Sequence, residues 1–125
     1  MSLKIFLAAA LTMLVVNIGA FAAEETTVYY FHTNKRCTKC RNLETYAKEA
    51  VDQLADKTLR WKVINIEDAD NEHYVTDYLL ITSSVVLVKT SDGKVEKWKN
   101  LDKIWRLVKN KQKYIDYIQE SINSF

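Results

Sequence analysis

Residues 27–40, Thr-Val-Tyr-Tyr-Phe-His-Thr-Asn-Lys-Arg-Cys-Thr-Lys-Cys, decide how this chain folds. The run from Thr27 to His32 is β-branched and aromatic, and it is apolar enough for a strand buried on both faces. A polar loop then leads to Cys37. From Cys40 to Leu54 apolar residues recur at helical spacing, with charged residues between them. The stretch therefore predicts a strand, a short loop and an amphipathic helix that begins at a C-x-x-C pair.

The rest of the chain continues the alternation of strands and helices. An acidic turn at 67–71 suits the start of a short helix, because negative side chains are stabilised at a helix N-terminus. The dipeptide Asp92-Gly93 supplies the positive φ angles that a tight hairpin needs. We expect further strands at Leu59–Ile66, Ser84–Val88 and Val95–Lys99 and a helix at His73–Leu79.

The C-terminal part carries two apolar stripes at helical spacing, which predict two helices or one long bent helix. Asn100 is the expected cap of the first and Asn110 of the second. The resulting order is β-α-β-α-β-β-α. The helical crossover favours parallel pairing of the first two strands, and the hairpin makes the last two antiparallel. We expect an α/β domain over residues 26–125, with a mixed four-stranded sheet and helices on both of its faces.

Residues 1–22 have the order of a secretory signal. Lys4 precedes an apolar run from Ile5 to Val16, and Ala20-x-Ala22 is a cleavage pattern. The alternative is an uncleaved anchor, since 5–23 holds no charge and approaches the length of a membrane-spanning helix. Both interpretations predict an exported, periplasmic or otherwise extracytoplasmic domain. With 125 residues and a net charge of +2, the chain has room for one domain and lacks the basic excess of a nucleic-acid binder.

The two cysteines, Cys37 and Cys40, are the candidate catalytic residues. A bond between them closes almost no loop and adds little stability through chain entropy, so its purpose is chemical. A helix N-terminus favours a thiolate on Cys37, and the thiolate is the species that attacks disulfides. We expect Cys37 to be the exposed nucleophile and Cys40 the shielded resolving thiol. Four nearby bases should lower the thiol pKa further: Lys35, Arg36, Lys39 and Arg41.

The element order and the position of the motif resemble the thioredoxin fold over residues 26–125. Three stretches resemble a narrower family more closely: Val28-Tyr-Tyr-Phe-His32, Arg36-Cys-x-x-Cys-Arg-Asn42 and Trp98-Lys-Asn-Leu101 with Trp105. This family is the exported thioredoxin-like subunit of a nitrophenyl-compound nitroreductase system. It is encoded with a flavoprotein-type reductase and an efflux permease in aromatic-arsenical resistance clusters. The resemblance implies a protein redox partner, such as a membrane or flavoprotein reductase.

The chain departs from ordinary thioredoxins at two supporting positions. It contains no proline, and Ser83 occupies the place of the cis-proline that faces the cysteine pair, so a trans peptide is expected there. The buried acid of thioredoxins lies six residues before the first cysteine, where this chain has Phe31. His32, the next residue, is a candidate proton-handling group, with a purely structural strand histidine as the alternative.

Two other functions use the same features. Paired thiolates can hold Cu(I), Zn²⁺ or a trivalent arsenical, although Cys37, Cys40 and His32 give at most three ligands for a structural zinc site that normally needs four. A docking adaptor is the third interpretation, and the intact cysteine pair argues against it. With two glycines and no phosphate-binding loop, we expect no nucleotide or other cofactor and no dedicated metal site.

Overall fold

The strand–loop–helix unit predicted from residues 27–40 is present in the computed structural model, which describes residues 23–125. β1 (Glu24–His32) leads through the loop to α1 (Thr38–Leu54), so the helix begins directly after Cys37. The predicted export segment, residues 1–22, lies outside the described residues. Within residues 23–125, no helix is long and apolar enough to cross a membrane.

The remaining elements follow in the expected order, with a 3-10 turn before the short second helix. They are β2 (Leu59–Asn65), η1 (Ala69–Asn71), α2 (Glu72–Asp77), β3 (Ser84–Ser91), β4 (Lys94–Asn100), α3 (Ile104–Leu107) and α4 (Lys111–Asn123).

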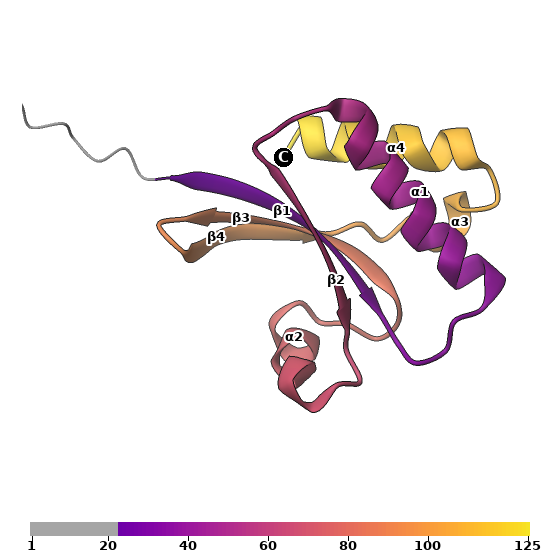
Figure 1. Cartoon of the computed structure of the whole chain (residues 1–125), viewed down its shortest axis with the longest axis horizontal. Helices are drawn as coiled ribbons and strands as arrows, with labels where there is room; N and C mark the ends of the chain where they lie inside the picture. Colours follow the sequence, from indigo (N-terminus) through magenta and orange to yellow (C-terminus); the bar gives the residue numbers. More distant parts are fainter. Residues whose placement is uncertain (1–22) are drawn as a thin grey trace, which may run out of the picture.

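β1 is a central strand of a four-stranded sheet with the order β2-β1-β3-β4. It pairs in parallel with β2 and antiparallel with β3, and β3 pairs antiparallel with β4. Figure 1 shows α1 lying across the sheet with α4 beside it, while α2 lies beyond the ends of β1 and β2. The expected mixed sheet and the thioredoxin-like fold class are confirmed by this strand order and pairing.

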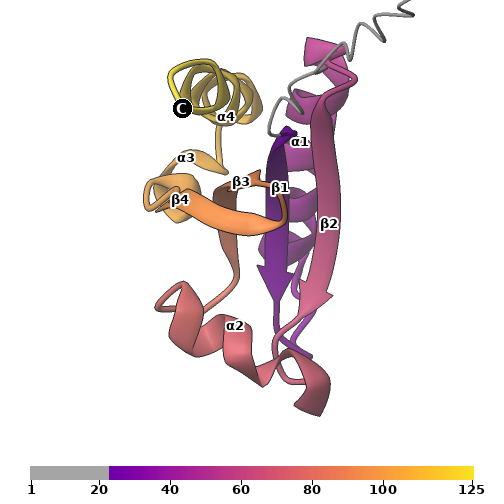
Figure 2. The ribbon, with the colours of Figure 1, turned by 90° about the vertical axis from the view of Figure 1, so that its left-hand side faces the viewer.

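Side chains of β1 alternate between the two faces of the sheet, as a strand requires. Val28 and Tyr30 belong to a core shared with α1, α3 and α4. Phe31 belongs to a second core, which lies against α2. The prediction of a strand buried on both faces is confirmed, and Figure 2 shows α2 at a different part of the sheet from α1 and α4.

Two of the local signals in the sequence formed as predicted. Asp92 and Gly93 have φ angles of 51° and 78° and close the hairpin between β3 and β4. The side chain of Asn110 accepts a hydrogen bond of 3.1 Å from the backbone N–H of Lys113, so it caps α4. The C-terminal stripes therefore form two separate helices.

The predicted cap at Asn100 is wrong. Asn100 is the last residue of β4 and pairs with Val86, and the N–H of Leu101 continues the pairing by bonding to the carbonyl of Val85 at 2.9 Å. Because the backbone of this segment is used by the sheet, α3 begins only at Ile104, and Lys103 before it provides no side-chain cap.

Candidate functional site

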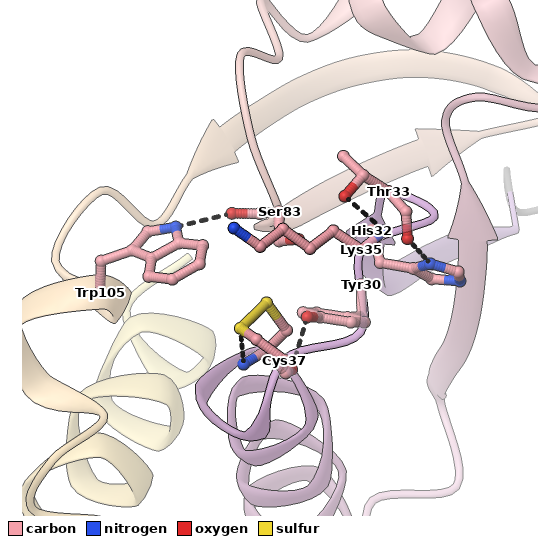
Figure 3. The surroundings of a disulfide bond; sticks show 8 residues. Tyr30, His32, Thr33, Lys35, Cys37, Ser83 and Trp105 are labelled. Carbon is pink, nitrogen blue, oxygen red and sulfur yellow. Dashed lines mark hydrogen bonds between the residues drawn. A yellow bond between two sulfur atoms is a disulfide. The ribbon is translucent and has the colours of Figure 1, made fainter.

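Cys37 is the N-cap residue of α1 and is joined to Cys40 by a disulfide, with their Cα atoms 5.0 Å apart. Its Sγ accepts a hydrogen bond of 3.1 Å from the backbone N–H of Cys40 (Figure 3). This N–H belongs to the first turn of the helix, where backbone donors have no partner within the helix. Cys40 is only 5% exposed, whereas Cys37 is more accessible. A partner sulfur can therefore approach Cys37 and is kept from Cys40.

The four bases around the cysteine pair do not act alike. The guanidinium of Arg36 forms an ion pair with Glu44 at 2.7 Å, so its charge is largely balanced within the protein. Lys35, Lys39 and Arg41 are exposed. In Figure 3, the side chain of Lys35 extends across the space above the disulfide with its ammonium towards Ser83.

Ser83 lies in the loop that faces the cysteines, and it is 3% exposed. The indole Nε1 of Trp105 donates a hydrogen bond of 2.9 Å to the Ser83 carbonyl (Figure 3). No peptide bond within residues 23–125 is cis, so the peptide before Ser83 is trans as expected. The loop is therefore held by α3 through Trp105, a contact between residues 22 positions apart that no local pattern indicates.

His32 does not face the cysteine pair. Its Nδ1 lies 2.9 Å from the Thr33 carbonyl, and its ring stacks on Tyr30 with centroids 6.1 Å apart. In Figure 3 the imidazole lies on the far side of Tyr30 from the disulfide. The arrangement fits a structural strand histidine that is not directed at the disulfide.

Phe31 does not occupy the position beneath the resolving cysteine, contrary to the count of six residues before Cys37. Phe31 faces the other side of the sheet and packs in the core next to α2. Its neighbour Tyr30 faces α1, is fully buried, and donates a hydrogen bond of 2.8 Å from its hydroxyl to the Cys40 carbonyl. The alternation of side chains along β1 identifies Tyr30 as the residue beneath Cys40, because Tyr30 lies on the same face of the sheet as Val28. Counting back from Cys37 does not identify it.

A second buried phenol supports α1 one turn further on. Tyr114 of α4 donates a hydrogen bond of 2.7 Å to the Leu43 carbonyl. Burial raises the pKa of Tyr114, and Tyr30 adds to the rise. Burial also raises the pKa of Tyr30, although the Ser83 side chain and Arg36 act in the opposite direction. Both hydroxyls therefore stay protonated and serve as donors at neutral pH.

An open pocket of about 270 Å³ adjoins the loop that carries Ser83. Two aliphatic side chains at its edge are unusually exposed, Ile81 at 96% and Leu79 at 73%. Such exposed apolar groups around a hollow are typical of surfaces that contact another molecule. The pocket is lined by Leu79, Ile81, Thr82, Ser83, Ser84, Asn100, Leu101, Asp102, Ile104 and Trp105.

The described part of the chain contains no group of three or more His, Cys, Asp or Glu side chains placed to hold a metal ion. His32, the third ligand considered from the sequence, bonds instead at its Nδ1 with the Thr33 carbonyl. Among residues 23–125, no third side chain of these types therefore joins the two cysteine sulfurs in a metal-binding group.

No family model and no curated protein sequence matches the chain. Among solved structures it is similar to a thioredoxin from Fasciola hepatica, with 16% identity, a TM-score of 0.46, and coverage of 77% of this chain and 80% of that one. A thioredoxin from Trypanosoma brucei brucei has 18% identity and a TM-score of 0.43, with 79% and 80% covered. Thioredoxin f2 from Chlamydomonas reinhardtii has 14% identity and a TM-score of 0.42, with 72% and 82% covered. The fold assignment rests on the strand order and pairing of the chain itself.

The buried phenols predict a loss of stability at alkaline pH. An unfolded tyrosine ionises near pH 10, whereas Tyr30 and Tyr114 keep their protons above that value because burial raises their pKa. The folded state then binds more protons than the unfolded state, so the free energy of unfolding falls as the pH rises above about 10. The fall is about 1.4 kcal/mol per pH unit for each phenol that stays protonated.

Urea unfolding at increasing pH, followed together with phenolate absorbance, measures this effect. A variant with both Tyr30→Phe and Tyr114→Phe should show a shallower decline than the wild type. The prediction is wrong if all seven tyrosines ionise near pH 10 while the protein is still folded.

Proposed function

We propose that the chain is an exported thiol–disulfide redox protein that exchanges two electrons with a protein partner through Cys37 and Cys40. The observation that carries this proposal is the position of Cys37 as the N-cap of α1, with its Sγ bonded to the Cys40 N–H and with Cys40 buried behind it. A cap of this kind favours the thiolate of the accessible cysteine and keeps the second sulfur within reach of the first.

The reaction has two steps when the dithiol form meets an oxidised partner. The Cys37 thiolate attacks one sulfur of the partner disulfide, a mixed disulfide forms, and the leaving thiolate takes a proton from water. Cys40 then loses its proton to water and attacks the Cys37 sulfur, which releases the second partner thiol. The partner gains two electrons and two protons, and the chain returns to the disulfide. The relative reduction potentials decide whether this sequence or its reverse occurs.

The surface next to the pair supports a protein as the partner. Ile81 and Leu79 are exposed beside the pocket formed with Trp105, and this pocket can receive one large apolar side chain. Because the pocket adjoins Ser83, a side chain seated there would hold the neighbouring backbone of the partner close to Cys37.

Export and the identity of the partner are proposed from the sequence. The signal pattern at 1–22 favours cleavage after Ala22, and a mature N-terminus at Ala23 in protein recovered from its native cell would support it. The stretches around Cys37 and Trp98 resemble a subunit of a nitrophenyl-compound nitroreductase system. We therefore propose a flavoprotein-type or membrane-bound reductase of an aromatic-compound or arsenical resistance system as the electron partner.

The exchange mechanism predicts a trapped intermediate. In Cys40→Ser the mixed disulfide on Cys37 cannot be resolved, so covalent complexes should accumulate in the native cell and disappear on addition of dithiothreitol. Mass spectrometry of the complexes identifies the partner, and recovery of a flavoprotein or membrane reductase supports the resistance-system proposal.

Two controls accompany the trapping experiment. Cys37→Ser should form few complexes, because the remaining Cys40 is buried. The purified wild type should cycle reversibly between dithiol and disulfide in glutathione buffers. If neither trapped complexes nor reversible cycling is observed, the proposed redox function is contradicted.

The proposed docking side chain predicts a partner-specific defect. Ile81→Ser should slow the reaction with the trapped protein partner about tenfold, since burying an isoleucine contributes about 1.5–3 kcal/mol. Reduction of the Cys37–Cys40 disulfide of this variant by dithiothreitol needs no docking, so its rate should be unchanged. Val95→Ser is the matched control, because Val95 is 54% exposed but lies by the β3–β4 hairpin. Equal rates for all three proteins would rule out the docking role of Ile81.

A further inference from the structure

We propose that Tyr30 is the positioning residue of the cysteine pair, which rests on the redox function proposed above. Its hydroxyl donates a hydrogen bond of 2.8 Å to the Cys40 carbonyl and thereby restrains the backbone of Cys40, whose N–H, in the preceding peptide unit, bonds to the Cys37 sulfur. On this proposal the Tyr30 hydroxyl keeps Cys37 acidic and the dithiol form stable, although Tyr30 touches neither sulfur in a reaction step.

The two hydrogen bonds meet on one residue of the first helical turn. The Cys40 N–H donates to Cys37 Sγ, and the Cys40 carbonyl accepts from Tyr30. Residues at a helix N-terminus are held weakly, because their N–H groups have no partner one turn earlier. A contact from outside the helix therefore adds to the restraint on Cys40, the residue whose N–H points at the sulfur.

The contact matters most in the reduced protein. In the oxidised form, the covalent bond to Cys37 already restrains the side chain of Cys40. Reduction removes this restraint, while the bond from Tyr30 to the Cys40 carbonyl is unaffected by the redox state of sulfur. The thiolate on Cys37 then depends on the tyrosine to keep its hydrogen-bond donor in place.

Tyr30 is itself rigidly held. It lies in β1, where it pairs with Val63 of β2 and with Val85 of β3, and its side chain is fully buried. The phenol therefore connects the cysteine helix with a central strand of the sheet.

Tyr114 offers a matched comparison within the same protein. It is also fully buried, and its hydroxyl donates to a carbonyl of the same helix, at Leu43 instead of Cys40. Removing either hydroxyl leaves one buried carbonyl without its tyrosine donor. If these phenols only stabilise the fold, Tyr30→Phe and Tyr114→Phe should behave alike.

The experiment compares the two variants with the wild type. Thiolate absorbance across pH gives the acid dissociation constant of Cys37, and equilibration with glutathione gives the constant for reduction of the disulfide. We expect Tyr30→Phe to lower both constants about three- to tenfold, the effect of one hydrogen bond of ordinary strength. Tyr114→Phe should leave both within about twofold of the wild type, while its stability to urea falls as much as that of Tyr30→Phe.

A measurement on the wild type makes the test independent of any variant. Amide hydrogen exchange of Cys40 should stay slow after reduction, and fast exchange in the dithiol form would overturn the proposal. Unchanged constants in Tyr30→Phe, or equal changes in both variants, would overturn it as well. A wild-type pair that fails to cycle with glutathione would instead refute the proposed redox function on which the inference depends.

Discussion

The burial of β1 on both faces is the constraint on which the rest of the molecule depends. Its side chains alternate between a core with α1 and α4 and a core with α2, so each residue is committed to one side. This commitment places Tyr30 under the helix that carries the cysteines and Phe31 under the short helix. A shift of β1 by one residue that brought Phe31 to the position of Tyr30 would put an apolar ring beneath Cys40, with no hydroxyl to bond its carbonyl.

The architecture was largely predictable from the sequence because its signals are local. The spacing of apolar residues indicated the helix after Cys40, and Asp92-Gly93 indicated the hairpin. The site was less predictable, because its contacts join distant residues. The ion pair of Arg36 with Glu44 and the bond from Trp105 to Ser83 arise only when the elements pack together.

Two errors show how local rules compete with tertiary structure. Asn100 has the chemistry of a helix cap, but its segment is extended by pairing with β3, and sheet pairing prevailed over capping. Counting six residues back from Cys37 assumed a loop of fixed length, whereas the pleat of β1 decides which residue faces the helix. In both cases strand pairing determined the structure: it kept Asn100 extended, and it set which side chains of β1 face α1.

Fixed dipoles and mobile charges differ in what they contribute to the thiolate. Lys35, Lys39 and Arg41 are exposed, and interactions of exposed charges in water contribute about 0–1 kcal/mol and weaken with salt. The Cys40 N–H lies 3.1 Å from the Cys37 sulfur and is held by the helix and by Tyr30. A hydrogen bond to a charged group contributes about 1.5–3 kcal/mol. The backbone donor therefore outweighs any single lysine in setting the chemistry of Cys37.

The same distinction applies to the loop at Ser83, which lacks the proline of ordinary thioredoxins. A proline restrains its backbone covalently, whereas this loop is held by hydrogen bonds. The Ser84 hydroxyl bonds to the Thr82 carbonyl at 2.8 Å, and Trp105 bonds to the Ser83 carbonyl at 2.9 Å. The second of these bonds comes from α3, so the shape of this loop depends on how α3 packs. Trp105 also lines the adjoining pocket, so the residue that holds the loop forms part of the wall of this hollow.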